Sequence, residues 1–342
     1  MKAAILEGIK KIRIREIPIP QISENEVLIK IKEVSLCSSD LHYYNEGRLN
    51  KRKVTDSFIL GHESSGIIEK IGANVHNLKV GDRVAIEPGV PCLRCEFCKS
   101  GKYNECKNLI FLSAPPNDGT LAEYIKYDSN FVHKIPENIS FSQAALIEPL
   151  SVGYYAVMRA DIKPGDNVCI LGCGPIGLAC LEMARISGAA KIFITDTLDY
   201  RLIIARAHGA FRTINILNTN LNDVIIEETE GNGVEKVIES SGTESAIRQS
   251  LEIVKNCGTI VWVGMGKNEI TIPYIETIYK DLTIKGVFRY VNTYGPLIKL
   301  IERGAINFEG ILSHRFKFED IQKAIDTAND QNIEKVKIII YM

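Results

Sequence analysis

The sequence has almost no net charge, no long apolar run and few cysteines, and each shortage excludes a class of protein. Its 41 basic and 42 acidic residues leave a net charge of −1, which provides no basic field for nucleic acid or anionic lipid. The longest weakly polar run, residues 168–181, holds three glycines and a proline and ends at Glu182, whereas a membrane span needs about 18 apolar residues. Nine cysteines in 342 residues are too sparse for a disulfide scaffold. We therefore expect neither a nucleic-acid nor a membrane partner.

The rest of the composition is that of a globular protein with a large core. Hydrophobic residues make up 45% and charged residues 24% of the chain, and these ordinary values exclude disorder of the whole chain. At about 150 residues per domain, the length favours two domains. The apolar stretch after Lys2 is too short for a signal peptide. With no targeting segment visible, we expect a cytoplasmic protein.

Strand and helix patterns divide the chain into three segments. Residues 1–150 contain short β-branched runs separated by turns, such as 12–15 and 27–31, which is typical of a barrel-like β domain. Residues 151–281 alternate strand-like and helix-like runs, which indicates a doubly wound parallel sheet. In residues 282–342 the alternation fades, and we expect this tail to return to the first domain. The predicted fold class is therefore α/β, with a β-rich and a doubly wound domain.

A glycine-rich turn lies between the first strand and the first helix of the second segment. It has the pattern G-x-G-x-x-G and consists of Gly172, Cys173, Gly174, Pro175, Ile176 and Gly177. Gly172 permits a tight turn, Gly174 lets the backbone approach a pyrophosphate, and Gly177 lets helix and strand pack closely. The pyrophosphate would lie on the unpaired N–H groups at the helix N-terminus.

An acidic residue ends the next strand. Asp196 lies nineteen residues after Gly177, against about 20 in dinucleotide-binding units. A carboxylate there can bind both hydroxyls of the adenosine ribose and repels a 2′-phosphate, which favours NAD over NADP. Arg201 is a nearby cation that could offset part of this repulsion. The alternative is an ordinary glycine-rich turn beside a surface aspartate.

Four of the nine cysteines crowd into one short stretch. They are Cys92, Cys95, Cys98 and Cys106, with the spacing C-x2-C-x2-C-x7-C. Thiolates two residues apart can bind one tetrahedral ion, and four of them leave no open position, which predicts a structural zinc. Such an ion would order a loop that has little apolar material. The alternatives are free thiols, an iron–sulfur site or a zinc ribbon, whose cysteine pairs usually lie about 15–20 residues apart.

A second set of metal-binding residue types is spread over the first segment. Cys37 stands among polar residues, His62 and Glu63 stand in the run G-H-E-S-S-G, and Glu148 precedes a proline. Each could be incidental, since a lone histidine is more often structural than a ligand. Beside a nicotinamide site, the four supply a thiolate, an imidazole and two carboxylates. That is enough for an open catalytic zinc with a water position.

Taken together, these motifs resemble the zinc-dependent medium-chain dehydrogenases, and among them the sorbitol (L-iditol 2-) dehydrogenase-like polyol dehydrogenases. The resemblance runs along nearly the whole chain. It rests on G-H-E-x-x-G, on the cysteine loop and on two runs of the polyol branch, I-E-P-L-S-V-G at 147–153 and G-V-F-R-Y at 286–290. The resemblance implies a GroES-like catalytic domain and a Rossmann domain. It also implies NAD, one catalytic and one structural zinc per subunit, and a homotetramer.

The resemblance also implies roles for single residues. Cys37, His62 and Glu63 would bind the catalytic zinc, and Glu148 would hold its water or alternate with it. Alcohol dehydrogenases commonly carry cysteine at that position, and glutamate favours polyols. A secondary hydroxyl would be oxidised to a ketone, with its proton leaving through Ser39 or the zinc water and His42 as an outer relay. The other predicted contacts are to the polyol, from Tyr43, Phe111, Arg289 and Tyr290, and to the cofactor, from Val263, Gly264, Met265 and Phe288.

Two other functions fit the sequence less well. One is an alcohol or L-threonine dehydrogenase on the same scaffold, which Glu148 and Arg289 disfavour. The other is a non-catalytic protein that keeps the fold, which the presence of Cys37 and His62 disfavours. Residue identities leave open which polyol configuration is accepted and in which direction the reaction runs.

Overall fold

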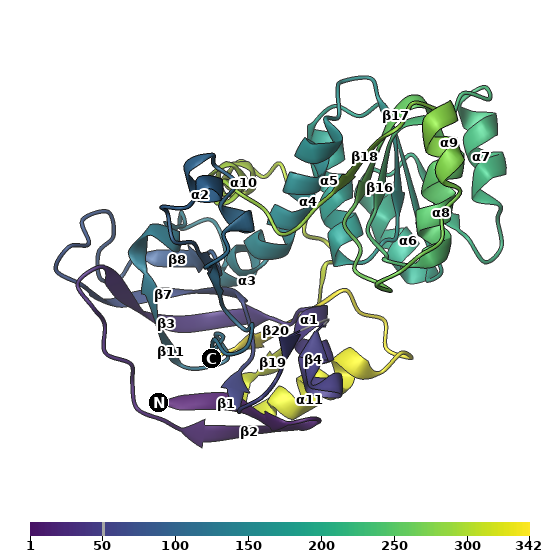
Figure 1. Cartoon of the computed structure of the whole chain (residues 1–342). Helices are drawn as coiled ribbons and strands as arrows, with labels where there is room; N and C mark the ends of the chain where they lie inside the picture. Colours follow the sequence, from purple (N-terminus) through teal and green to yellow (C-terminus); the bar gives the residue numbers. More distant parts are fainter. Residues whose placement is uncertain (50–51) are drawn as a thin grey trace. The chain divides into compact units, whose positions relative to one another are not determined.

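The computed structural model describes residues 1–49 and 52–342. The chain forms two compact units (Figure 1). Unit 1 comprises Met1–Glu148, Tyr294–Gly304 and Gly310–Met342, and unit 2 comprises Pro149–Thr293 and Ala305–Glu309. The chain therefore passes from unit 1 to unit 2 and back twice.

Unit 1 is rich in strands. Within its described residues they are β1 (Lys2–Gly8), β2 (Lys11–Glu16), β3 (Glu26–Ser35), β4 (Arg48–Leu49), β5 (Arg52–Lys53), β6 (Phe58–Ile59), β7 (Glu63–Ile71), β8 (Arg83–Ile86), β9 (Gly89–Val90), β10 (Ile110–Phe111), β11 (Tyr124–Asp128), β12 (Val132–Lys134), β19 (Leu312–Lys317) and β20 (Lys337–Tyr341). Its helices are α1 (Ser38–Glu46), α2 (Glu96–Lys99), α3 (Phe141–Ala145), α10 (Tyr294–Glu302) and α11 (Ile321–Asn329), with 3-10 turns η1 (Tyr103–Glu105), η2 (Ser129–Phe131) and η3 (Phe318–Asp320).

Unit 1 is organised around β3. In the described residues, seven strands form one sheet in the order β12-β8-β7-β3-β20-β19, with β11 also paired to β3. On one edge of β3, β11 pairs with residues 26–30 and β20 with residues 33–35. The sequence of β3 explains its central place, because Lys30 is the one exposed residue among its ten. A separate sheet of β2-β1-β6 and the ladders β9-β10 and β4-β5 complete the unit.

Unit 2 alternates strands and helices. They are α4 (Ile147–Ala160), which begins in unit 1, β13 (Asn167–Leu171), α5 (Pro175–Ile186), β14 (Lys191–Asp196), α6 (Asp199–Ala207), β15 (Arg212–Asn215), α7 (Leu221–Glu228), β16 (Val234–Glu239), α8 (Glu244–Ile253), β17 (Val254–Trp262), α9 (Tyr274–Tyr279) and β18 (Thr283–Gly286). Among the described residues of the whole chain, no helix combines the length and apolar character needed to cross a bilayer.

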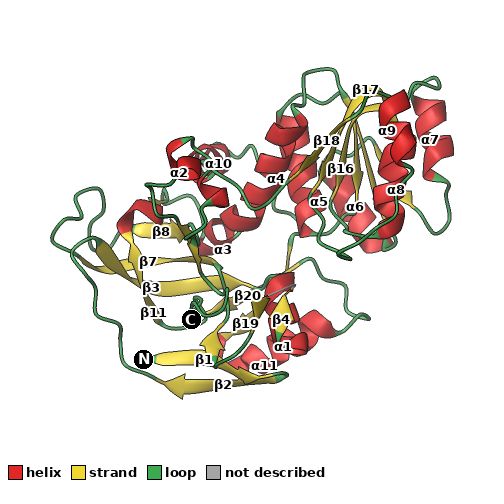
Figure 2. Cartoon of the chain, viewed as in Figure 1, coloured by secondary structure: helices red, strands yellow, loops and turns green. Residues whose placement is uncertain are grey.

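The strands of unit 2 form a parallel sheet. Its described residues give six strands in the order β15-β14-β13-β16-β17-β18, and every neighbouring pair is parallel. The order reverses at β13, and right-handed crossovers then place α5 and α6 on one face and α8 on the other. Figure 2 shows helices on both faces. The predicted doubly wound sheet is confirmed, and ligands of such sheets bind where the order reverses, beyond the carboxyl ends of β13 and β16.

The sequence patterns missed the helices α1, α3 and α4. In α1 the buried residues are Asp40, Tyr43 and Tyr44, so the face that packs inward includes a carboxylate and lacks an apolar stripe. The helix is positioned by the contacts of Asp40 described below, and these are tertiary contacts that no local pattern encodes. In α3, Ser140 and Gln143 form a capping box around a five-residue helix, which is too short for hydrophobic periodicity to show.

A buried ion pair binds Ala305–Glu309, the second segment of the chain that belongs to unit 2. His208 and Glu182 are both buried, and His208 Nδ1 lies 2.8 Å from Glu182 Oε1. His208 Nε2 lies 2.7 Å from the carbonyl oxygen of Glu309, so both ring nitrogens face acceptors and the charged imidazolium satisfies both. Glu182 Oε2 accepts from Arg185 Nη2 at 2.8 Å and from the Asn307 N–H at 3.2 Å. Burial lowers the pKa of His208, but Glu182 and the Glu309 carbonyl outweigh it and raise that pKa above 6.5.

This pair makes the stability of unit 2 dependent on pH. Because the folded pKa of His208 is raised, its contribution is complete below about pH 6.5 and is lost as the pH rises through the folded pKa. We expect His208→Gln to lower the free energy of unfolding by about 3–5 kcal/mol near pH 6. The difference from the wild type should shrink toward about pH 9. Thermal unfolding midpoints of both proteins across this pH range test the prediction.

His76→Gln is the control, because His76 is exposed and its loss should leave the profile unchanged. A stability difference between His208→Gln and the wild type that is equal at both ends of the range would contradict the charged pair.

Candidate functional site

The end of β3 and the start of β7 bring three metal-binding side chains together. The strands are antiparallel neighbours, and Ser35, the last residue of β3, pairs with Glu63, the first residue of β7. Cys37 follows β3 by two residues, and His62 directly precedes β7. The ligand atoms of Cys37, His62 and Glu63 all lie within 4.8 Å of one another. His62 is 6% and Glu63 1% exposed, so the cluster is largely withdrawn from water.

Two glycines of the G-H-E-x-x-G run make this approach possible. Gly61 has a φ of +94°, and a Cβ there would lie 2.9 Å from Val34 Cγ1. A Cβ on Gly66 would lie 2.5 Å from the carbonyl oxygen of Lys30 on β3. Glycine is therefore required at the first position by backbone conformation and crowding, and at the second by the close contact of β7 with β3.

Asp40, on the first turn of α1, binds the backbone on both sides of the cluster. Its Oδ2 accepts from the Cys37 N–H at 3.1 Å, and its Oδ1 accepts from the Gly61 N–H at 3.1 Å and from Ser113 Oγ–H at 2.8 Å. The same Oδ1 lies 3.7 Å from His62 Nδ1, a buried nitrogen with no hydrogen-bond partner among the described residues. A carboxylate beside the second nitrogen of a metal-binding histidine orients the ring. No sequence motif pointed to Asp40, whose one local signal is the capping box it forms with Cys37.

The electrostatics of the cluster favour a positive charge. Burial lowers the pKa of His62, but the anions of Asp40 and Cys37 outweigh it and raise that pKa well above its ordinary value. Burial also lowers the pKa of Lys337, yet Glu63 and Cys37 raise it above its ordinary value. Lys337 Nζ lies 2.5 Å from Glu63 Oε2. In both groups the anionic surroundings thus outweigh the penalty that burial places on positive charge.

The residues present fit a divalent metal ion. A thiolate, an imidazole and a carboxylate are three donors of the kind that catalytic zinc sites use, and such sites keep a fourth position open. The anionic surroundings that raise the pKa values of His62 and Lys337 agree with this.

The other predicted catalytic residues of unit 1 differ in their surroundings. The Phe111 ring lies 5.7 Å from the His62 ring, measured between centroids. Glu148, in the first turn of α4, is 6% exposed and acts electrostatically on Lys337. Ser39 is half-buried at the start of α1.

His42 and Tyr43 are neighbours on α1 that differ in exposure. The side chain of His42 is 50% exposed, and its Nδ1 lies 2.9 Å from Glu46 Oε1. The Tyr43 ring packs edge-on against Phe58 with centroids 5.6 Å apart, inside the hydrophobic core.

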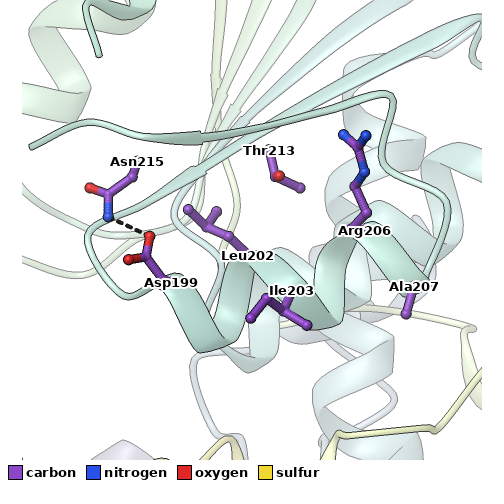
Figure 3. A pocket seen from close by; sticks show the side chains of 7 residues that line it. All are labelled: Asp199, Leu202, Ile203, Arg206, Ala207, Thr213 and Asn215. Carbon is purple, nitrogen blue, oxygen red and sulfur yellow. Dashed lines mark hydrogen bonds between the residues drawn. The ribbon is translucent and has the colours of Figure 1, made fainter. Parts of the chain in front are cut away.

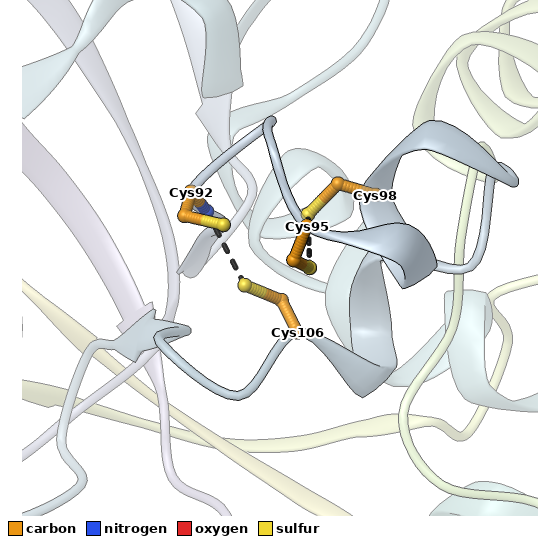
Figure 4. Close-up of side chains that lie close together, drawn as sticks. All are labelled: Cys92, Cys95, Cys98 and Cys106. Atoms are coloured by element: carbon orange, nitrogen blue, oxygen red, sulfur yellow. Dashed lines mark hydrogen bonds between the residues drawn. The ribbon is translucent and has the colours of Figure 1, made fainter.

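The four clustered cysteines also converge on one point. Figure 4 shows the side chains of Cys92, Cys95, Cys98 and Cys106 directed toward one another, and their sulfur atoms all lie within 4.8 Å of one another. The N–H groups of Arg94 and Cys95 lower the pKa of Cys92 to about 6, whereas burial and the neighbouring sulfurs raise the pKa of Cys98 to about 12. Sulfurs this close oppose one another's ionisation, and a bound divalent cation removes that conflict because it deprotonates its thiol ligands. The residues fit a four-sulfur metal site.

In unit 2 the glycine-rich turn has the expected conformation. Gly172 has a φ of +100°, and a Cβ on Gly177 would lie 2.0 Å from the Gly172 carbonyl oxygen. A Cβ on Gly174 would meet one atom within 4 Å, Arg201 Nη1 at 3.9 Å, so the backbone there is open to a ligand. Gly174 is the N-cap of α5, and Pro175 is its first residue. The turn thus presents a helix N-terminus beyond the end of β13.

Asp196 lies at the end of β14 beside this turn. Its Oδ2 accepts from the Cys173 N–H at 2.9 Å, and its Oδ1 accepts from the N–H groups of Thr197 at 2.8 Å and Leu198 at 3.0 Å. Arg201 Nη1 lies 3.6 Å from Asp196 Oδ2. Backbone donors therefore fix the carboxylate next to the glycine-rich turn.

The sequence analysis missed Glu239 at the end of β16. This fully buried carboxylate accepts through Oε1 from the Ser241 N–H at 2.7 Å and the Gly242 N–H at 2.8 Å. Its backbone carbonyl accepts from the N–H groups of Val263 at 2.8 Å and Gly264 at 3.0 Å. Glu239 thus fixes the segment predicted to border the nicotinamide, of which Met265 is 63% exposed. Its one sequence signal was its place at the end of a strand-like run.

The last predicted residues follow β18. Tyr290 is 4% and Phe288 48% exposed. Arg289 has a φ of +55°, and its guanidinium lies over the Phe288 ring, 4.7 Å from the centroid.

A hollow of about 680 Å³ lies between α6 and β15 (Figure 3). None of the predicted site residues lines it. Its lining is formed by Asp199, Leu202, Ile203, Arg206, Ala207, Thr213 and Asn215.

Comparison with known proteins gives consistent matches along the whole chain. The profile described as alcohol dehydrogenase GroES-like domain matches residues 23–137, and that described as zinc-binding dehydrogenase matches residues 175–303. Sorbitol dehydrogenase of Bacillus subtilis (strain 168) is 40% identical over 100% of this chain and 97% of its own length. A probable D-xylulose reductase A of Aspergillus clavatus is 40% identical over 94% of this chain and 91% of its own. A crystal structure of an Escherichia coli oxidoreductase/dehydrogenase of unknown specificity superposes with a TM-score of 0.96 at 34% identity, covering 99% of this chain and 98% of that one.

Gly61 and Gly81 have similar backbone conformations, so they allow a matched test of the packing around the residue that precedes His62. Gly81 has a φ of +89° with nothing within 4 Å of an added Cβ, whereas Gly61 at +94° is crowded by Val34. We expect Gly81→Ala to cost about 1–2 kcal/mol, the strain of the left-handed backbone alone. Gly61→Ala should cost about 1–3 kcal/mol more because of the overlap. Denaturant unfolding of both variants measures the difference, and equal losses would contradict the packing described here.

Proposed function

The chain belongs to the zinc-binding, GroES-like alcohol dehydrogenase family, and from that premise we propose that it oxidises a secondary hydroxyl of a polyol to the ketose with NAD as hydride acceptor. The sorbitol, xylitol and iditol type of substrate follows from the relatives named sorbitol dehydrogenase and D-xylulose reductase. The observation that carries the proposal is that the sulfur of half-buried Cys37 lies within 4.8 Å of one buried imidazole and one buried carboxylate. Glu148 supports it, since a second carboxylate is buried nearby and acts on the same lysine.

Cys37, His62 and Glu63 are the residues that would hold the catalytic zinc. When bound, such an ion acts as a Lewis acid that lowers the pKa of a hydroxyl at the open position toward neutrality. Asp40 keeps the His62 ring and the Cys37 backbone in place through the contacts described above. Glu148 orients water or the substrate hydroxyl beside the donors.

The reaction removes a proton from the substrate hydroxyl and a hydride from the carbon that bears it. Ser39 relays the proton, accepting it at Oγ while its own hydroxyl proton passes on toward His42, or water beside Glu148 takes the proton. His42 passes the proton to solvent, as its exposed ring and its contact with Glu46 allow. Phe111 borders the substrate on the His62 side.

The remaining hydroxyls of the polyol need polar partners. We assign this role to Arg289, Tyr290 and the phenolic hydroxyl of Tyr43, whose ring is fixed in the core. The positive φ of Arg289 is a strained backbone conformation of the kind that clusters at ligand sites.

The cofactor is a nicotinamide dinucleotide, and we propose NAD over NADP. Its pyrophosphate would lie at the N-terminus of α5, over Gly174, Pro175 and Ile176. Asp196 would bind the adenosine ribose, and Arg201, at 3.6 Å, is paired with that carboxylate. Val263, Gly264, Met265 and Phe288 would border the nicotinamide.

We further propose two zinc ions per subunit, the second structural and bound by the four clustered cysteines. Residues 1–150 and 282–342 would form the catalytic domain, and residues 151–281 the NAD-binding domain. The protein would be a cytoplasmic homotetramer. Apolar side chains on α9, which precedes β18 in the chain, support self-association, since Tyr274, Ile278 and Tyr279 are 65%, 58% and 77% exposed.

Polyol oxidation is tested by NADH formation at about 340 nm with a panel of polyols, simple alcohols and L-threonine, with NAD and with NADP. We expect polyol-dependent NADH formation that a zinc chelator abolishes and a slower reaction with NADP. Glu148→Gln should lower kcat/KM by about 10²–10⁴-fold, as for loss of a group that handles a proton. Activity with L-threonine or simple alcohols alone would contradict the substrate assignment, and chelator-resistant activity would contradict the metal.

The structural zinc is tested by removing one sulfur donor. Cys98→Ser should lose about one equivalent of zinc per chain and lower the thermal unfolding midpoint, because metal binding contributes folding free energy. Cys257→Ser is the matched control, since Cys257 is exposed and lies outside both metal clusters of the described residues. Equal zinc content in the two variants would overturn the four-cysteine site.

A further inference from the structure

We propose that Lys337 is a positioning residue for the metal ligand Glu63. Its ammonium binds Oε2 of that carboxylate and leaves Oε1 as the oxygen free to bind zinc. This inference rests on the proposed function, because it concerns the same metal site. The family motifs do not include Lys337, and no feature of the sequence singled it out.

The ammonium of Lys337 reaches both strands that carry the donors. Its Nζ lies 2.5 Å from Glu63 Oε2, at the start of β7, and donates to the Leu36 carbonyl oxygen at 2.8 Å. Leu36 lies between the end of β3 and Cys37. One side chain from the C-terminal strand β20 therefore joins the residue before one ligand to the carboxylate of another.

The backbone of Lys337 is fixed, so its ammonium has a defined position. Its N–H donates to the Ile311 carbonyl at 3.0 Å, and its own carbonyl accepts from Ser313 Oγ–H at 2.9 Å. The next residue of β20, Ile338, accepts through its carbonyl from the Leu36 N–H at 3.0 Å. Strand β20 thus binds Leu36 through both its backbone and the lysine side chain.

The deep burial of the Lys337 side chain needs a physical explanation. Lys337 is 3% exposed, and lysine is almost never so buried unless it is paired. Desolvating an ammonium is costly, and replacing a whole buried ion pair by apolar residues is often neutral or stabilising. Three side chains act on it electrostatically, namely Glu63, Cys37 and Glu148. The positive charge of Lys337 allows the carboxylates of Glu63 and Glu148 to lie close to the sulfur of Cys37 in the interior.

Without Lys337, both oxygens of Glu63 would be available to the metal, and the carboxylate would lack its orienting partner. Outer partners of metal ligands typically affect metal affinity by about 10–100-fold. We therefore expect zinc to leave the catalytic site about 10–100-fold faster in Lys337→Met than in the wild type.

The experiment measures zinc release from the purified protein into excess chelator. The phase that belongs to the catalytic site is identified by its absence in Cys37→Ser, and the phase of the cysteine cluster by its absence in Cys98→Ser. Lys337→Gln is the second variant, since its amide keeps a donor for Leu36 while the charge is lost. Both variants should release zinc faster from the catalytic site and at the wild-type rate from the cysteine cluster, which also reports that unit 1 is folded.

Lys280→Met is the control for the loss of a lysine that is half-buried and donates to backbone carbonyls. Lys280 Nζ donates to the carbonyls of Leu251, Glu252 and Val254 in unit 2 and has no carboxylate partner among the hydrogen bonds and ion pairs of the described residues. Its loss should change stability and leave zinc release unaltered.

A double-mutant cycle with Glu63→Gln separates positioning from a general structural role. If Lys337 acts through the carboxylate, Lys337→Met should change zinc release by no more than about twofold in the Glu63→Gln background. An equally large effect in both backgrounds would overturn the proposal, as would a wild-type release rate in both Lys337 variants. If both Lys337 variants release zinc at the wild-type rate while the wild type oxidises polyols in a chelator-sensitive way, only the role of Lys337 is overturned and the proposed function stands. A wild type that binds no zinc at Cys37, His62 and Glu63 would overturn both.

Discussion

The antiparallel pairing of β3 with β7 is the constraint on which the candidate metal site depends. Because the end of one strand lies beside the start of the other, residues 25 positions apart, Cys37 and His62, are brought together. The pairing requires Gly66, which admits the Lys30 carbonyl, and Gly61, whose backbone turns into β7. A loop alone could carry the same donors, but it would hold them less closely than two strand ends do.

Around this junction, charge is distributed in two shells. The inner shell holds a thiolate and a carboxylate beside one imidazole, and the outer shell holds Asp40 on one side and Lys337 on the other. Asp40 accepts hydrogen bonds from backbone and hydroxyl donors, and Lys337 donates to Glu63 and Leu36. Asp40 is an acceptor and faces the imidazole of His62, whereas Lys337 is a donor and faces the carboxylate of Glu63. Two ligands in the same pocket are thus oriented by outer residues of opposite charge. Metal sites are commonly supported in this way by partners of their ligands.

The sequence predicted those parts of the fold and site that short spacing encodes. The G-x-G-x-x-G turn, Asp196 and the cysteine cluster could each be recognised because their chemistry lies within about 25 residues. The doubly wound sheet followed from alternating strands and helices. Lys337 and Asp40 could not be predicted, since the partner of Lys337 is 274 residues away in the chain and the contacts of Asp40 are tertiary. The helix α1 was missed for the same reason, because its inward face is fixed by a carboxylate that no hydrophobic period includes.

We propose that Cys37, His62 and Glu63 bind one zinc ion and that the four clustered cysteines bind another. Anomalous diffraction from crystals of the protein, recorded above and below the zinc absorption edge, tests it most directly. We expect two peaks per chain, one bounded by Cys37, His62 and Glu63 and one by Cys92, Cys95, Cys98 and Cys106. A peak at the cysteine cluster alone, in zinc-loaded protein, would contradict the catalytic metal site.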